Sequence, residues 1–342
     1  MIFKKKSYFN IVLSVYVLLL IIFGRTDGKE IIANVFGLIF IASYIGGQLL
    51  SGKATSMISV EFKLFGLFGG LGVFLCVFSS YSDPFRLITF LQVMLLGWVI
   101  FNVIALYGNL NSLEFPIYFG VIYSLWSIYT GMYEFEFGRT GGPLGHPNSF
   151  GLFLVIAISF AVRRLMILDS QNQKISIIFR VVLLIIVGMC LFQLIEFSGS
   201  RRSLIIGVLI LTCYFGFAFF SRVVSIKINL MYVGFGILAF PFVVNYISNS
   251  TLYYRLANLI DFFDGYSINE GSLDERYYMI VKGYELWKHS PIYGWGFDAF
   301  KNASGFGVYS HNNYIEILSN MGLIGFAMFY LAYFFLGKKI YC

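Results

Sequence analysis

Long apolar runs dominate the chain, and most are about as long as a helix that crosses a membrane. A bilayer core of about 30 Å takes roughly 20 helical residues, so runs of that length predict transmembrane helices. We expect ten spans, over residues 8–23, 31–50, 62–79, 86–107, 113–132, 148–165, 176–195, 203–220, 228–247 and 312–336. The short alternating segments of a membrane β-barrel do not occur. The pattern predicts an all-α integral membrane protein, with residues 1–342 as one polytopic domain.

A polar stretch between the ninth and tenth spans, residues 248–311, predicts one large loop. Within it, Ser272 and Glu275 have the spacing of a capping box, which starts a helix. An apolar stripe follows at helical spacing, formed by Tyr277, Ile280, Val281, Tyr284 and Trp287. Pro291 ends the helix. We therefore expect the loop to carry an amphipathic helix that lies on the membrane surface.

Composition supports a membrane protein and excludes soluble classes. Hydrophobic residues make up 58% of the chain and charged residues 12%, about half of what soluble domains carry. The mean hydropathy is +0.80. The net charge of +7 is scattered between apolar spans, so we expect no nucleic-acid partner. The four cysteines form no CxxC pair and have no metal-ligand spacing, so the sequence predicts no metal site and no cofactor.

The distribution of Lys and Arg predicts which side each loop faces. With a cytoplasmic N-terminus, the inner segments hold twelve of these cations and the short outer loops hold six. The positive-inside rule then places both termini in the cytoplasm and residues 248–311 outside. Arg163 and Arg164 cut into the end of the sixth span, and we expect them to snorkel to the inner surface.

Four outer arginines suggest an anion site. Arg139 lies in the loop FGRTGGPLGHPNSFG, Arg201 and Arg202 lie in EFSGSRRSL, and Arg276 opens the loop helix. Guanidinium groups match phosphate oxygens in pairs, and the neighbouring glycines allow close approach. A structural alternative remains open for each arginine, namely contact with lipid phosphates or an ion pair with a nearby glutamate.

Histidine is rare, and one of the three stands out. His146 precedes Pro147 and favours a role in shaping a turn, whereas His289 ends the loop helix. His311 lies before the last span, where it either starts the helix structurally or serves as a base. A neutral imidazole accepts a hydroxyl proton near pH 7 and typically contributes about 10²–10⁴-fold to a rate.

The sequence also lacks the motifs of enzymes that bind soluble activated donors such as nucleotides. It contains no GxxxxGK[ST] loop, no GxGxxG after a strand and no Asp-x-Asp pair. A substrate that reaches an outer site through the membrane must already be activated. A lipid diphosphate fits, since its anion suits the arginines and its tail suits the bilayer.

Four blocks in order resemble the O-antigen ligase and O-antigen polymerase superfamily. The first contains Arg139 and His146-Pro147-Asn148, and the second is Ser198-Gly199-Ser200-Arg201. The third contains Glu275, Arg276, Trp287, Pro291, Gly294, Gly296 and Phe300, and the fourth contains His311, Asn312, Tyr314, Gly322 and Gly325. Family members commonly continue with further spans, whereas this chain ends at Cys342, as a short or a truncated member.

The resemblance implies a GT-C-like helical fold and metal-independent, inverting glycosyl transfer from an undecaprenyl-diphosphate-linked glycan. Carried onto this sequence, it makes His311 the catalytic base. It makes Arg201, Arg276 and Arg139 the ligands of the diphosphate, with the adjacent Arg202 as a further ligand. Asn312 and Asn148 are expected to support the acceptor or the loops.

The resemblance leaves several functions open. We expect first a polymerase that joins lipid-linked repeat units into a capsule or O-antigen, in the bacterial inner membrane with an extracytoplasmic active site. A ligase that moves the finished glycan to a lipid-A core or a protein is the close alternative, and a lipid-linked sugar flippase or an inactive scaffold is the more distant one. Expected partners are the lipid-linked donor and acceptor, membrane lipids, and proteins of polysaccharide export or chain-length control.

Overall fold

The structure is a computed structural model that describes residues 2–24, 30–50, 59–107, 110–135, 139–170, 177–220 and 271–341. The elements of regular structure in these residues are helices. The chain forms two compact units: unit 1 takes residues 1–40 and 109–268, and unit 2 takes 41–108 and 269–342. Helix α2 (Glu30–Leu50) contributes its first half to unit 1 and its second half to unit 2.

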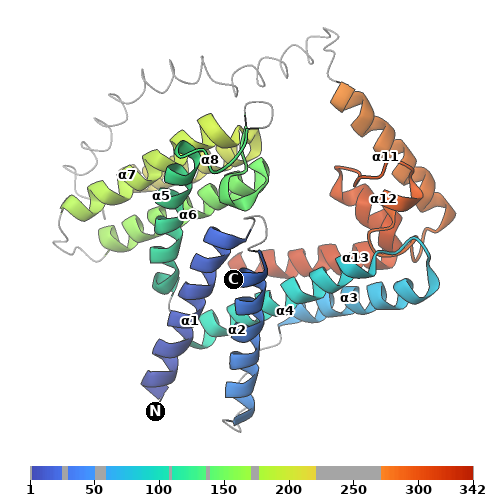
Figure 1. The fold of residues 1–342 in the computed structure, drawn as a ribbon, viewed down its shortest axis with the longest axis horizontal. Helices are drawn as coiled ribbons and strands as arrows, with labels where there is room; N and C mark the ends of the chain where they lie inside the picture. The colour runs from blue at the N-terminus through green and yellow to red at the C-terminus, as the bar shows by residue number, and fades with distance from the viewer. Residues whose placement is uncertain are drawn as a thin grey trace. The chain divides into compact units, whose positions relative to one another are not determined.

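Unit 1 is built around α6 (Pro147–Ser170), which packs against α5 (Glu114–Tyr129), α7 (Ile177–Gln193) and α8 (Arg201–Phe220). Helix α1 (Ile2–Phe23) packs on α5 (Figure 1). The position of α6 follows from its sequence, because apolar residues recur every three or four positions along it. The buried residues of this stripe are Phe150, Leu154, Ile158, Ala161 and Leu165.

Unit 2 pairs membrane-length helices with the loop helix. Helix α13 (Asn313–Tyr341) packs against α3 (Val60–Phe78), and α3 packs against α4 (Pro84–Tyr107). Helix α11 (Gly271–His289) and the short α12 (Phe300–Ala303) pack on α13 (Figure 1). Two apolar clusters hold these contacts, one with Phe68, Leu75 and Met321 and one with Met279, Leu286 and Phe300.

Nine of the ten predicted spans fall on helices. The remaining one, the ninth in chain order at 228–247, lies outside the described residues. Within the described part, six helices are long and apolar enough to cross a membrane, and Tyr8–Phe23 is a shorter apolar helix. Helix α5 has 16 residues and spans about 24 Å at 1.5 Å per residue, less than a bilayer core. The all-α membrane class agrees with these helices, whereas the count of ten and the GT-C-like fold remain predictions.

The basic end of α6 is paired within unit 1. Glu114 starts α5 directly after the 3-10 turn η1 (Leu110–Leu113), and its side chain is 12% exposed. Arg163 Nη1 lies 3.2 Å from one of its carboxylate oxygens, and Arg164 Nε lies 3.7 Å from the other. The sequence predicted that both arginines snorkel to the surface. In the structure a carboxylate from the preceding span also pairs with them, and their snorkelling stays a prediction.

Helix α13 is broken near its first third. Gly322 has φ 62° and ψ −167°, which no helix contains. In an unbroken helix the amides of Leu323 and Ile324 would donate to the carbonyls of Ser319 and Asn320. The break leaves these four groups without helical partners, and buried unpaired backbone groups are costly, especially in lipid.

A loop segment, residues 291–296, supplies the missing partners. The first amide after the break donates to Pro291 O at 2.9 Å, and the second donates to Ile292 O at 3.3 Å. The two carbonyls before the break accept from the amides of Trp295 and Gly296, at 2.9 and 2.8 Å. The break in α13 and the conformation of the loop are therefore one structure, since each satisfies the backbone of the other.

Candidate functional site

Arg139 is fixed in unit 1 by contacts on both sides of its guanidinium. Its Nε donates to Ser198 O at 2.8 Å, and its Nη2 donates to Asn148 Oδ1 at 3.3 Å. The short turn η2 (Gly142–Leu144) lies between Arg139 and α6. Thr140 N also donates to Phe197 O, at 2.9 Å. The predicted Arg139 and Asn148 therefore lie together, against the backbone that precedes Arg201.

That backbone is a π-helical segment, η3 (Leu194–Ser198), at the end of α7. Gly199 ends it in the left-handed conformation with φ 54°, and its amide donates to Leu194 O at 3.0 Å. A Cβ at Gly199 would lie 3.2 Å from Arg139 Nε, so the glycine leaves room for the arginine. π-helical turns occur often at functional sites.

The two arginines of the second block begin α8. Arg201 is half-buried and Arg202 is exposed. Ser203, one residue further along, has its hydroxyl 3.1 Å from that of Ser200, and both side chains are buried. The adjacent Arg201 and Arg202 thus differ in exposure, as neighbours on a helix do when they lie on different faces. Unit 1 thus presents Arg139, Asn148, Arg201 and Arg202 around one π-helical turn.

His311 in unit 2 has an unusual backbone conformation. Its φ is 56°, in the left-handed region that histidine visits more readily than most residues. Its side chain is exposed, and its ring centroid lies 4.2 Å from that of Tyr309. A strained backbone at a candidate catalytic residue is typical of sites that hold a side chain in one orientation.

The residues on either side hold His311 in this conformation. Asn312 caps α13, since its Oδ1 accepts from the amides of Tyr314 and Ile315 at 3.0 and 3.2 Å. Ser310 N donates to Glu316 Oε2 at 2.6 Å, and Ser310 Oγ donates to Asn312 O at 3.0 Å. Asn312 therefore supports the loop, and Glu316 ties the residue before the histidine to the first turn of α13.

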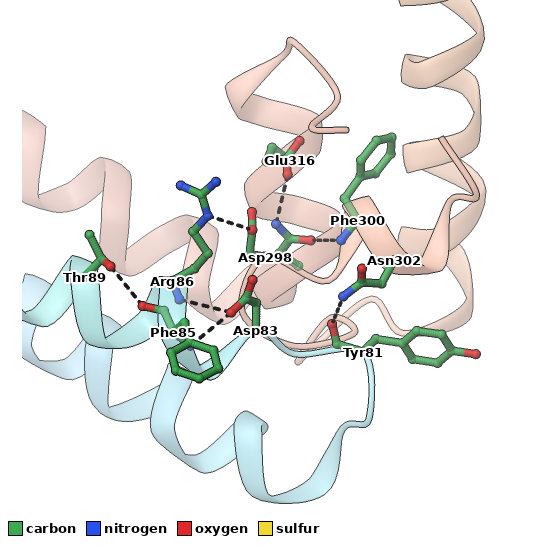
Figure 2. A network of polar contacts seen from close by, with 10 residues as sticks. Tyr81, Asp83, Phe85, Arg86, Thr89, Asp298, Phe300, Asn302 and Glu316 are labelled. Carbon is green, nitrogen blue, oxygen red and sulfur yellow. Dashed lines mark hydrogen bonds and ion pairs between the residues drawn. The ribbon is translucent and has the colours of Figure 1, made fainter. Parts of the chain in front are cut away.

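Glu316 belongs to a polar network at this end of unit 2 (Figure 2). Its other oxygen accepts from Asn320 Nδ2 at 3.2 Å, and Asn320 Oδ1 accepts from Phe300 N at 2.6 Å. Asp298, with φ 57°, lies 3.8 Å from Arg86. Burial raises the pKa of the Asp298 carboxyl above its usual 3.8, the charge of Glu316 adds to the rise, and Arg86 opposes it. Among the described residues, no group of three or more His, Cys, Asp or Glu could hold a metal ion.

Helix α11 packs on α13 through a stripe other than the aromatic one that the sequence predicted to face the membrane surface. Met279 is 2% exposed and Leu286 is 8% exposed, whereas Tyr277 and Tyr284 are 64% and 46% exposed. Gly283 lies between the two buried residues, and a Cβ there would overlap Ile315. The packing against α13 selects the stripe that contains a glycine, and a membrane-facing role of the exposed aromatic stripe stays a prediction.

Arg276 lies in the first turns of α11 and is exposed. The predicted capping box of Ser272 cannot be compared, because the side chains of residues 271–274 lie outside the described ones. Among the predicted site residues, Arg276, His311 and Asn312 belong to unit 2, and Arg139, Asn148, Arg201 and Arg202 belong to unit 1.

Sequence reasoning missed two residues that position the predicted ones. Ser198 was read only as part of a motif, yet its carbonyl holds Arg139. Glu316 was not singled out, yet it holds the residue before His311. A carboxylate three to five residues after a loop histidine, at a helix start, is the signal that could have revealed Glu316.

One comparison with known proteins gives a match. Residues 190–330 match the family model described as O-antigen ligase. No curated protein and no solved structure matches the chain. The matched region begins in the last turns of α7 and ends within α13, so it contains Arg201, Arg202, Arg276 and His311. Together with the six apolar helices of the described part, the match indicates a multi-pass membrane protein.

Proposed function

We propose, from the membership of residues 190–330 in the O-antigen ligase and polymerase superfamily, that this chain is a glycosyltransferase. Its proposed reaction joins undecaprenyl-diphosphate-linked repeat units into a surface polysaccharide, a capsule or an O-antigen. The match to the family is the observation that carries this proposal. Arg139 lies outside the match but supports it, since its Nε bonds Ser198 O inside the matched region.

In the proposed reaction, a sugar hydroxyl of the acceptor attacks the anomeric carbon of the donor. The bond between that carbon and the diphosphate oxygen breaks, and its electron pair leaves on the diphosphate. The acceptor proton passes to the imidazole of His311. Attack opposite the leaving group inverts the anomeric centre, and the step needs a base near pH 7, which an imidazole supplies.

The arginines would hold the diphosphate as its negative charge grows. A guanidinium binds two phosphate oxygens at once, and its charge counts for more as the leaving group departs. Arg139 is suited to this role, because Ser198 and Asn148 fix its orientation before the substrate arrives. The proposal requires one donor to reach the arginines and His311 during the same turnover.

A ligase is the second candidate, and the description of the matched family favours it. A ligase transfers the finished glycan from the same type of carrier to a lipid-A core or a protein. The two functions share the donor and the chemistry and differ only in the acceptor. They are therefore separated by what accumulates when the reaction is blocked.

The test is His311→Asn in the producing cells. Asparagine also tolerates the left-handed conformation of residue 311 but accepts no proton near pH 7. Surface polysaccharide is resolved on a gel, and glycans released from the lipid carrier by mild acid are resolved beside it. A polymerase defect leaves single repeat units in both fractions, whereas a ligase defect leaves long chains on the carrier. Unchanged surface ladders at normal protein levels would refute the role of His311.

The arginines are tested by conservative replacement. Arg201→Lys and Arg276→Lys keep the charge but lose the paired donors. We expect each variant to shorten or abolish the ladder while its amount in the membrane stays normal. Full activity of either lysine variant would remove that arginine from the proposed diphosphate site.

A further inference from the structure

A pocket of about 420 Å³ opens in unit 2 between the α3–α4 turn and the segment that follows α11. Three aromatic side chains line it, Phe78, Tyr81 and Trp295, together with the hydroxyls of Ser79 and Ser290. Its volume lies in the range of about 300–1,000 Å³ that is typical of small-molecule sites. Nothing in the proposed chemistry of His311 or the arginines uses it.

The walls of the pocket are held in place before any ligand binds. Trp295 Nε1 donates to Leu286 O at 2.7 Å, and Ser79 Oγ donates to Trp295 O. The rings of Tyr81 and Trp295 meet edge to face, with centroids 5.5 Å apart. Asn302 Nδ2 donates to Tyr81 O at 3.1 Å. The surfaces of Tyr81 and Trp295 are thus preorganised, which lowers the entropy that binding costs.

The lining is neutral and mixed in polarity. Among the described residues that line the pocket, none is Lys, Arg, Asp or Glu, and His289 is the titratable residue besides Tyr81. A diphosphate would be expected to select arginines or lysines, and an acyl chain would be expected to select aliphatic walls. Aromatic faces beside hydroxyl acceptors suit a ligand that has apolar C–H faces and a rim of hydroxyls, which describes a pyranose ring.

The position of the aromatic residues favours the same conclusion. Phe78 is the last residue of α3, and Tyr81 lies beyond it in the turn before α4. Their side chains are 72% and 40% exposed. Aromatic residues also form belts at membrane surfaces, but a belt needs neither a pocket nor an indole fixed by a hydrogen bond to the backbone, as that of Trp295 is.

We propose that this pocket is a sugar-binding subsite that takes one pyranose unit of the glycan substrate. The inference rests on the proposed function, since it names where a glycosyltransferase would hold part of its glycan. The sugar stacks on the rings of Phe78 and Tyr81, and its hydroxyls donate to the oxygens of Ser79 and Ser290. Pocket and histidine both belong to unit 2, so one unit carries sugar recognition and the candidate base.

The test measures binding directly with the purified full chain in detergent. The probe is the free repeat-unit oligosaccharide, released by mild acid from the lipid-linked units of the producing cells. We expect Phe78→Ala and Tyr81→Ala each to weaken its binding about tenfold by calorimetry. Phe85→Ala is the matched control, since Phe85 is 80% exposed in the next helix and does not line the pocket. Its binding should stay within about twofold of wild type.

Two further measurements separate sugar binding in the pocket from catalysis and from lipid binding. His311→Asn should bind the oligosaccharide as wild type does even though it makes no polymer, so the subsite and the reaction fail independently. Undecaprenyl phosphate in vesicles is the second probe, and the pocket variants should bind it normally. The inference is overturned if the wild-type chain does not bind the oligosaccharide or if the pocket variants bind it unchanged. It is equally overturned if they lose only the lipid probe, because the occupant is then a lipid.

Discussion

Gly199 in unit 1 and Gly322 in unit 2 have nearly the same φ, 54° and 62°, yet they have different structural roles. Gly199 ends a π-helical turn whose backbone stays hydrogen-bonded within its own helix. Gly322 interrupts α13, whose freed groups pair with a loop from elsewhere in the chain. The first glycine faces the side chain of Arg139, and the second faces the backbone of Ile292.

The difference separates local from long-range structure. The turn at Gly199 depends on its own sequence and on one side chain, that of Arg139, which packs against it. The break at Gly322 depends on four hydrogen bonds to residues 291–296, which cannot move without losing their own partners. The candidate diphosphate ligands of unit 1 thus lie beside a turn that is hydrogen-bonded within its own helix, whereas the candidate base of unit 2 precedes a helix that a loop completes.

Gly322→Ala should have the largest effect. Its Cβ would overlap the Ile292 carbonyl, and the left-handed backbone is strained for alanine. Separating the loop from α13 would leave buried backbone groups unpaired, at about 1–3 kcal/mol each. We expect loss of several kcal/mol, read as a large fall in the thermal midpoint of the purified chain. Gly337→Ala in the same helix, where a Cβ has open space, is the control and should be nearly neutral. Equal stability of the two variants would contradict a stabilising role for the backbone hydrogen bonds between residues 291–296 and α13.

Arg139→Lys should have the next largest effect. Lysine keeps the charge but loses the Nε donor to Ser198 O and the fork that also reaches Asn148. Hydrogen bonds from charged groups contribute about 1.5–3 kcal/mol, so a destabilisation near the lower end is expected for this half-buried side chain. Denaturant unfolding without substrate measures it apart from any effect on activity. A variant as stable as wild type would mean that the two contacts do not stabilise unit 1.

Gly199→Ala tests the local side of the comparison. The left-handed backbone disfavours alanine by about 1–2 kcal/mol, but the nearest atoms, those of the Arg139 side chain, lie 3.2–3.4 Å from the added Cβ and need only a small shift. We expect a loss of about 1 kcal/mol, partly recovered in Gly199→Asn, because asparagine tolerates this region. Thermal unfolding of the two variants beside wild type provides the measurement. A loss as large as that of Gly322→Ala would abolish the distinction between the two glycines.

Asp298→Asn should have the smallest effect and the opposite sign at neutral pH. Because the folded pKa is raised, Asp298 contributes stability that is present below about pH 3.8 and is lost as the pH rises through the raised value. Asparagine does not ionise, so it avoids the cost of a buried charge at neutral pH, and it suits the φ of 57°. It forfeits the 3.8 Å pair with the exposed Arg86, which is worth little. We expect a gain below about 1 kcal/mol near pH 7, from thermal midpoints at several pH values. A pH dependence identical to wild type would show that the carboxyl titrates normally.

The sequence by itself determined the class of the protein and the positions of its helices. Apolar runs of membrane length located α3, α4, α7 and the other predicted spans in the described part to within a few residues, because burial in lipid depends on length and composition. Motif residues in order also identified the superfamily that residues 190–330 match. Both signals are local in the chain, so no knowledge of packing was needed.

Only the tertiary structure decided how the candidate residues are held. The carbonyl that fixes Arg139 lies 59 positions away along the chain, and the hydrophobic periodicity of the sequence does not predict such a contact. In the sequence Gly322 is an ordinary glycine in an apolar run. Only the structure shows that the helix breaks there and that residues 291–296 supply the missing hydrogen-bond partners. The buried stripe of α11 was likewise selected by its packing against α13. Hydrogen bonds and close packing between distant segments depend on geometry that hydropathy does not encode.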